Sequence, residues 1–122
     1  MFSSKDSEAL IIGIDLGTSS LKTMVLTETG FVVSQFAQEY PLQVPHAGYA
    51  EQDPEAWWQA VVKTLRLTLR KLGPRAVRIK GIGFSGQMHG LVILDENLRP
   101  IRPAIIHLDQ RSGQEVEEVY RK

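Results

Sequence analysis

Residues 9–22 combine an apolar strand, a glycine turn and the start of a second strand: Ala9-Leu10-Ile11-Ile12-Gly13-Ile14-Asp15-Leu16-Gly17-Thr18-Ser19-Ser20-Leu21-Lys22. The run up to Leu16 is rich in β-branched residues, which is typical of a buried strand. A second strand is expected over residues 21–26, after the turn. Since successive strand side chains point to opposite faces, Asp15 is expected on the face opposite Ile14, at the end of the strand.

A third strand is expected over residues 31–40, after a Thr29-Gly30 turn. Short links between strands favour an antiparallel meander. Further apolar runs at residues 79–84, 91–94 and 101–108 predict additional strands. A helix between strands indicates an α/β fold with a sheet that mixes antiparallel and parallel pairs.

The clearest predicted helix begins at Asp53-Pro54, a good N-cap followed by a favoured first residue, and ends at Gly73-Pro74. Its apolar side chains at helical spacing are interpreted as the core face, in preference to a ligand platform. They are Trp57, Trp58, Val61, Val62, Leu65, Leu69 and Leu72. Residues 1–8 are interpreted as a disordered lead-in to one domain over residues 9–122.

The composition describes one ordinary soluble domain of 122 residues, with 43% hydrophobic and 23% charged residues. Because the chain has no cysteine, Cys-based zinc, redox and thiol chemistry are excluded. The 14 basic residues match the 14 acidic ones, so no basic surface for nucleic acid or membrane is indicated. The polar, acidic start does not resemble a secretory signal, and no stretch approaches the roughly 20 apolar residues of a membrane span. We expect a cytoplasmic protein.

The glycine turn after the first strand is a candidate phosphate site. A glycine permits close approach of the backbone, successive amides and hydroxyls are donors to phosphate oxygens, and a lysine adds positive charge. The candidate phosphate-binding residues are Gly17, Thr18, Ser19, Ser20 and Lys22. Asp15 at the strand end needs a partner such as a cation or a metal-bound water if it is buried. A plain hairpin turn capped by Asp15 is the alternative, and the combination of Asp15 with Lys22 favours phosphate.

Two further segments carry polar groups between apolar runs. Residues 81–86 match the Gly-x-Gly-x-x-Gly pattern, but a strand rather than a helix is expected after them, which argues against dinucleotide binding. The next residues, Gln87, Met88 and His89, suit a small polyol, although a lone histidine in a turn is more often structural. Metal-ligand spacing does not link the three histidines.

Residues 107–111, His107-Leu108-Asp109-Gln110-Arg111, form the last polar cluster. Local reasoning favours a helix N-cap by Asp109 with a solvated Arg111.

Taken together, three segments resemble the N-terminal part of the FGGY carbohydrate kinases, and within that family the members that phosphorylate D-xylulose. They are residues 14–22, the stretch 51–58 (Glu-Gln-Asp-Pro-Glu-Ala-Trp-Trp) and Gly86-Gln87-Met88-His89-Gly90. The resemblance covers the chain from about Leu10 to its end. The first segment is shared with actin and heat-shock ATPases, whereas the Gln-Met-His-Gly segment distinguishes among sugar kinases.

The resemblance implies a ribonuclease H-like fold of the actin-like ATPase type, as the N-terminal portion of a two-domain sugar kinase. Asp15 would organise Mg²⁺ through water, the 17–20 turn would approach the transferred phosphate of ATP, and Met88 with His89 would touch the sugar. Gln87, His107 and Asp109 complete the expected sugar-binding set. Many family members have Trp where this chain has His107, so the residue that lines the sugar pocket there departs from the family pattern.

The family's catalytic aspartate and adenine-binding domain lie beyond Lys122, so no catalytic residue is assigned within these residues. The resemblance implies an N-terminal fragment of a kinase that transfers the γ-phosphate of ATP to a ketopentose, namely to the 5-hydroxyl of D-xylulose. For the full-length protein, a homodimer is one expected form of assembly. We expect the isolated chain to be inactive. The alternative is a non-catalytic ATP-binding or sugar-sensing module that keeps the phosphate turn.

Overall fold

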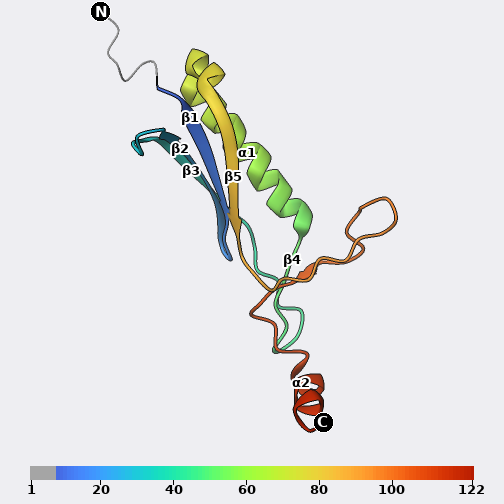
Figure 1. Ribbon diagram of the computed structural model, residues 1–122. Coiled ribbons are helices and arrows are strands. Elements are labelled where there is room, and N and C mark those ends of the chain that lie inside the picture. Colours follow the sequence, from blue (N-terminus) through green and yellow to red (C-terminus); the bar gives the residue numbers. More distant parts are fainter. Residues whose placement is uncertain (1–7) are drawn as a thin grey trace, which may run out of the picture. The chain divides into compact units, whose positions relative to one another are not determined.

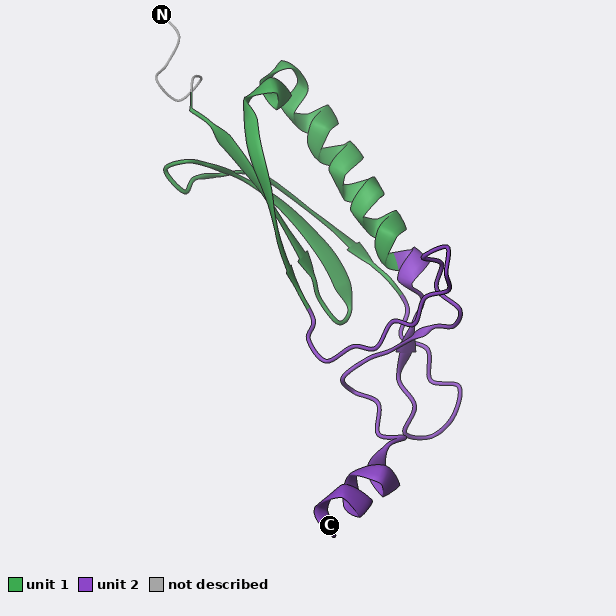
Figure 2. Cartoon of the chain, turned by 45° about the vertical axis from the view of Figure 1, so that its right-hand side comes forward, with its two compact units in different colours: residues 1–40, 57–86 green, residues 41–56, 87–122 purple. Residues whose placement is uncertain are grey.

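The computed structural model describes residues 8–122, which form two compact units. Unit 1 contains the chain up to Tyr40 together with Trp57–Gly86, and unit 2 contains Pro41–Ala56 with Gln87–Lys122 (Figure 2). The lead-in predicted over residues 1–8 lies outside the described residues except for Glu8. The carbonyl of Glu8 accepts a 2.7 Å hydrogen bond from Nε of Arg78, so this residue is held against unit 1.

Unit 1 is built on a four-stranded sheet in the order β3-β2-β1-β5 (Figure 1). Its strands are β1 (Leu10–Leu16), β2 (Ser20–Thr27), β3 (Val32–Glu39) and β5 (Ile79–Gly86). The first three form the predicted antiparallel meander, and β5 lies parallel to β1. The prediction of a mixed sheet is therefore confirmed, and the two turns of the meander are short enough to close adjacent strands directly.

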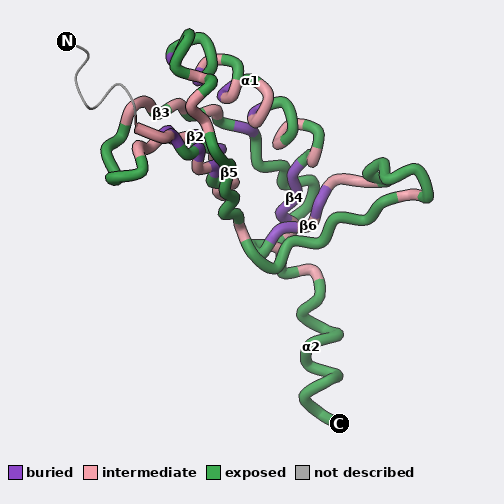
Figure 3. Tube along the Cα trace, turned by 45° about the horizontal axis from the view of Figure 1, so that its top comes forward, coloured by how far each residue is buried: buried purple, intermediate pink, exposed green. Residues whose placement is uncertain are grey.

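The core of unit 1 follows the strict alternation of strand side chains. Leu10, Ile12 and Ile14 are at most 3% exposed, and Val25 and Thr23, which pair with Ile12 and Ile14 on β2, are fully buried. In Figure 3 the buried residues are purple, and they lie on the central strands and on one side of α1 (Pro54–Leu72). Asp15 is exposed, as expected for the opposite face of β1.

Helix α1 begins and ends where predicted, but Leu72 is the one member of the predicted core set that is buried. Asp53 caps it, because the Asp53 Oδ1 accepts a 2.9 Å hydrogen bond from the Glu55 amide. Gly73 ends it at a φ of 56°, a conformation that favours glycine, and a 3₁₀ segment, η2 (Gly73–Arg78), follows.

The buried stripe of α1 is made of small and hydroxyl residues at a spacing of four: Ala60, Thr64, Thr68 and Leu72. The prediction that both tryptophans belong to the core is wrong for Trp58, which is 59% exposed. A small-residue stripe lets the helix lie close to the sheet, and a 2.7 Å hydrogen bond joins the hydroxyls of Thr23 and Thr64 across that interface. Hydrophobicity alone could not reveal this choice of face.

Unit 2 has little regular structure. Its strands are the two-residue β4 (Glu51–Gln52) and β6 (Ala104–Ile105), and its helix is α2 (Gly113–Tyr120). The strand predicted over residues 91–94 is wrong, since Leu91 and Leu94 make only isolated bridges. The strand predicted over 101–108 shortens to β6, because Pro100 and Pro103 cannot donate to a ladder.

Two further findings concern the residues that follow β5 and the character of the two α-helices. The chain leaves β5 through a bend rather than a helix, so the glycines of residues 81–86 do not form a dinucleotide fingerprint. Within residues 8–122, neither α-helix combines the length and apolar character that a membrane crossing requires.

Candidate functional site

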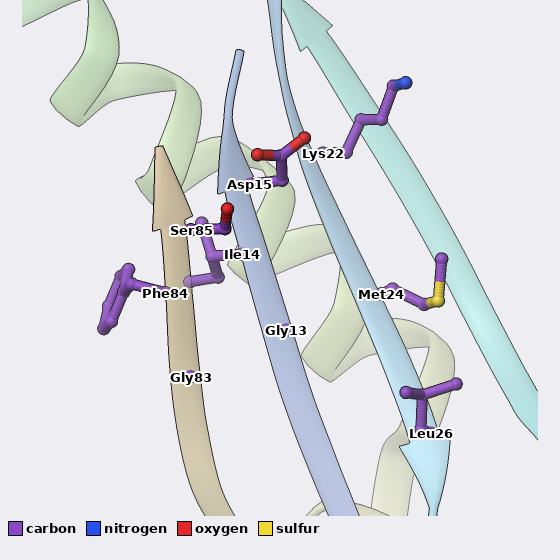
Figure 4. Close-up of a pocket in the computed structure, with 9 residues that line it drawn as sticks. All are labelled: Gly13, Ile14, Asp15, Lys22, Met24, Leu26, Gly83, Phe84 and Ser85. Carbon is purple, nitrogen blue, oxygen red and sulfur yellow. The ribbon is translucent and has the colours of Figure 1, made fainter. Parts of the chain in front are cut away.

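The register of the sheet brings three polar side chains into one row at the end of unit 1. Asp15 on β1 pairs with Lys22 on β2 and with Ser85 on β5. Residues paired across a sheet share a face, so the carboxylate, the ammonium and the hydroxyl all project from the face opposite Ile14. Figure 4 shows these side chains from three neighbouring strands. The place of Ser85 in this row was not predicted from the sequence, because it depends on the parallel pairing of β5 with β1.

A hollow of about 420 Å³ lies beside this row (Figure 4). Gly13 and Gly83 pair across β1 and β5, and neither has an atom within 4 Å of where a Cβ would stand. Met24 and Phe84 border the hollow with apolar surface. The two glycines therefore leave open backbone next to the polar row, which permits the close approach of a ligand.

The turn between β1 and β2 is tight. The Gly17 amide donates a 3.0 Å hydrogen bond to the Ser20 carbonyl, and a Cβ on Gly17 would stand 3.0 Å from that same oxygen. A side chain at Gly17 would therefore force the turn open. Thr18 and Ser19 form the tip of the turn, and their role as phosphate ligands stays a prediction.

Tyr40, at the end of β3, touches this turn twice. Its amide donates to the Ser19 carbonyl at 3.3 Å, and its hydroxyl donates to the Gly17 carbonyl. Burial, reinforced by the negative charge of Asp15, raises the pKa of Tyr40 to about 12. The phenol is therefore a neutral hydrogen-bond donor throughout the physiological range.

The donor set fits a metal that retains most of its water. Among residues 8–122, three or more His, Asp or Glu side chains nowhere gather into a cage. Asp15 is exposed and makes no ion pair within the described chain. A buried carboxylate would need a partner, but this exposed one is stable in water without it. Mg²⁺ is commonly held by one or two carboxylates together with substrate phosphates, and a single Asp15 beside the 17–20 turn is compatible with that kind of site.

The candidate sugar residues lie in unit 2. Gln87 Nε2 donates to the Oε1 of the buried Gln52 at 3.0 Å, whereas the Gln87 Oε1 is buried without a partner in the described chain. Met88 is 72% exposed. His89 has a φ of 61°, a left-handed conformation that is uncommon outside glycine, although histidine adopts it more often than most residues do.

A second hollow, of about 510 Å³, brings together residues distant in sequence. His89, His107, Asp109 and Arg111 all line it. Three of the candidate sugar residues, His89, His107 and Asp109, thus share one cavity with polar and apolar walls. Gln87 and Met88 do not line this hollow, and all of these residues stay predictions as sugar ligands.

Asp109 and Arg111 do more than the sequence suggested. Asp109 accepts a 2.7 Å hydrogen bond from the Ala50 amide and a further one, at 2.8 Å, from Nε of Arg111. Arg111 also pairs with Glu51 at 2.6 Å and lies 3.8 Å from the centre of the Tyr49 ring. The prediction that Asp109 is a helix N-cap is wrong, because α2 begins only at Gly113. The prediction that Arg111 is solvated is wrong as well, because its guanidinium pairs with both carboxylates.

The charges in this cluster are strongly coupled. The Arg111 hydrogen bond holds the pKa of Asp109 well below its usual range, assisted by the amides of Ala50 and Arg111. The Asp109 hydrogen bond in turn raises the pKa of Arg111, with help from Glu51. Since Asp109 is engaged on both oxygens, it has less capacity left for a sugar hydroxyl than its position in the hollow suggests. Glu51 and Tyr49 were missed because their partners are about sixty residues away.

The comparisons with known proteins agree on one family. The model of the N-terminal domain of the FGGY family of carbohydrate kinases matches residues 10–122. Xylulose kinase from Staphylococcus xylosus is 46% identical over 111 residues, which are 91% of this chain and 23% of that protein. The chain thus spans about a quarter of the length of the curated relatives it matches.

Solved structures confirm the fold. The xylulose kinase of Rhodospirillum rubrum superposes with a TM-score of 0.88 at 32% identity, over 92% of this chain and 23% of that one. The gluconate kinase of Lactobacillus acidophilus superposes with a TM-score of 0.87 at 28% identity, over 94% of this chain and 23% of that one. The mixed sheet with its helix is the ribonuclease H-like fold of actin-like ATPases that the resemblance implied.

Proposed function

Because this chain belongs to the FGGY family of carbohydrate kinases, we propose that it forms the N-terminal domain of a longer ATP-dependent sugar kinase, here called the parent kinase. The proposed reaction transfers the γ-phosphate of ATP to a ketopentose, converting D-xylulose to D-xylulose 5-phosphate. The observation that carries this proposal is the row of Asp15, Lys22 and Ser85, in register beside the glycine turn.

The proposed chemistry of unit 1 is positioning and charge neutralisation, which dominate phosphoryl transfer. Mg²⁺ would supply a positive charge for the phosphate oxygens. Asp15 would hold its water shell, Lys22 would add a second positive charge, and the 17–20 turn would donate hydrogen bonds. The open backbone at Gly13 and Gly83 leaves room for a polyphosphate next to this row.

The proposed sugar site uses unit 2. His89 and His107 line one hollow, so their imidazoles offer hydrogen bonds to hydroxyls on a single ligand. Met88 and Gln87 would add an apolar surface and an amide. Relatives named for xylulose support a ketopentose, and the likeness to a gluconate kinase makes an aldonate the first competing substrate to test.

We also propose that residues 1–122 are inactive alone. The general base that takes the proton from the sugar hydroxyl is not assigned to any residue here, and water exclusion needs a closing partner domain. The parent kinase is proposed to act in the cytoplasm on small molecules, without nucleic acid or membrane, and its assembly as a homodimer is a further proposal.

A coupled ADP-release assay tests the proposal. The isolated chain and the parent kinase are each supplied with ATP, Mg²⁺ and D-xylulose, and gluconate serves as the competing substrate. We expect turnover from the parent kinase with D-xylulose and none from the isolated chain. Sugar-dependent turnover by the isolated chain that disappears in Asp15→Ala would show a complete site within these residues. ATP binding without turnover in the parent kinase would favour a sensing module instead.

A further inference from the structure

The phosphate turn is held from outside by one residue of a different strand. Tyr40 follows the last residue of β3, yet its amide and its hydroxyl donate to two carbonyls of the 17–20 turn, those of Ser19 and Gly17. The β-ladder accounts for the first of these contacts, because Ser20 pairs with Glu39 and Tyr40 continues that pairing. The hydroxyl contact is a separate interaction made by the side chain.

The hydroxyl contact changes how the turn is closed. In a two-residue hairpin turn the Gly17 carbonyl would ordinarily accept a hydrogen bond from the amide of the residue opposite it, Ser20. Here the Gly17 amide donates to the Ser20 carbonyl at 3.0 Å, while the Gly17 carbonyl accepts from Tyr40. A peptide plane within the turn is therefore oriented by a phenol from β3.

The orientation of that peptide matters for a ligand. Every peptide bond described in this structure is trans, so the carbonyl and the amide of one peptide unit point in opposite directions. Drawing the Gly17 carbonyl toward Tyr40 turns the Thr18 amide toward the opposite side. Amides presented in this way form the anion-binding part of a phosphate turn.

The tyrosine is well suited to this task. It is 8% exposed, so water competes little for its hydrogen bond, and its high pKa keeps the proton on the oxygen. Phenylalanine would fill the same volume and lose only the hydroxyl. The contact is therefore separable from the packing of the ring.

We propose that Tyr40 is a positioning residue for phosphoryl transfer: its hydroxyl holds the Gly17 carbonyl, so that the peptide plane between Gly17 and Thr18 keeps the orientation that the transferred phosphate meets. This inference rests on the proposed function of the turn. It assigns no contact between Tyr40 and the substrate.

The test compares Tyr40→Phe with the wild-type parent kinase. The matched control is Tyr120→Phe, which removes the hydroxyl of an 86% exposed ring on α2. Asp15→Asn is the reference that reports on the site itself. For each protein we would measure kcat, the KM for Mg²⁺-ATP, the KM for D-xylulose, the thermal midpoint and hydrogen exchange of the turn amides.

We expect Tyr40→Phe to lower kcat/KM for ATP by about tenfold to a hundredfold, the range for a small misplacement of a reacting group. The KM for sugar should stay within about twofold, and the amides of residues 18–20 should exchange faster while those of β1 do not. Tyr120→Phe should change none of these quantities.

Each remaining outcome overturns the inference in a distinct way. If Asp15→Asn abolishes turnover but Tyr40→Phe leaves the ATP parameters unchanged, Tyr40 has no positioning role and the proposed function stands. If Tyr40→Phe lowers the thermal midpoint and worsens the KM values for ATP and sugar alike, its role is only structural. If Asp15→Asn retains full turnover, the proposed function fails and the positioning role fails with it.

Discussion

Unit 1 and unit 2 are stabilised by different kinds of interaction. Unit 1 is a sheet whose backbone ladder holds Asp15, Lys22 and Ser85 in one row. Unit 2 has only two-residue strands, and a cluster of side chains, Glu51, Asp109 and Arg111, holds its loops together. Many backbone hydrogen bonds fix the geometry of a site on a sheet, whereas a few charged side chains fix the geometry of a site on loops.

The difference bears on how each candidate site tolerates change. The polar row of unit 1 can lose a side chain and keep its backbone geometry, so a substitution there should affect chemistry more than folding. The hollow of unit 2 shares Asp109 and Arg111 with its own scaffold, so a substitution there should affect both. Four predictions test this contrast.

The largest effect is expected for Asp15→Ala in the parent kinase. Loss of one electrostatic stabiliser of a transferring phosphoryl group lowers turnover by about a hundredfold or more. Steady-state kinetics should show this loss in kcat with little change in the KM for sugar. Glu96→Ala, which removes an exposed carboxylate of unit 2, is the control. A collapse of sugar affinity with normal turnover would contradict the assignment of Asp15 to the phosphate side.

His89→Ala should mainly weaken sugar binding, since a hydroxyl contact is made in the ground state and the transition state alike. We expect a loss of about 1–3 kcal/mol in sugar affinity, measured as a rise in KM or by calorimetry. His89→Asn suits the positive φ of this residue better and separates lost contact from backbone strain. His46→Ala is the control imidazole. An unchanged KM for D-xylulose and gluconate in both His89 variants would return His89 to a structural role.

Thr64→Val tests the interface between α1 and the sheet. The variant leaves the fully buried Thr23 hydroxyl without its 2.7 Å partner, which should lower the free energy of unfolding by about 1–3 kcal/mol. Thr23→Val should cost less, because the Thr64 hydroxyl keeps its 2.9 Å hydrogen bond to the Ala60 carbonyl. Urea denaturation of the chain measures both. Equal losses in the two variants would show that this asymmetry is absent.

The smallest effect is a pH dependence in unit 2. Because the pKa of Asp109 is lowered by folding, its carboxylate contributes stability above the unfolded-state pKa of about 3.9. That contribution is lost as the pH falls from there toward the folded-state pKa. Thermal midpoints of the wild type and Asp109→Asn should therefore differ most near neutral pH and converge in acid. A constant difference down to pH 2 would contradict the role of this carboxylate.

Much of unit 1 follows from local pattern. The alternation in residues 10–16, the turn glycine and the Asp53-Pro54 start are short-range signals, and the structure confirms the elements that they predicted. The candidate site was harder to predict. The position of Ser85 depends on a parallel pairing between strands about seventy residues apart, and the contact between Tyr40 and Gly17 crosses from β3 to the turn.

By itself the sequence determined the strands of the meander, both ends of α1 and the motifs that identify the family, because each depends on neighbouring residues or on strict periodicity. Only the tertiary structure decided which face of α1 is buried and what Asp109 and Arg111 do. Helix packing depends on how closely small residues such as Ala60 and Thr64 allow two surfaces to approach. The pairing of Arg111 with Glu51 depends on a fold that brings together residues sixty positions apart.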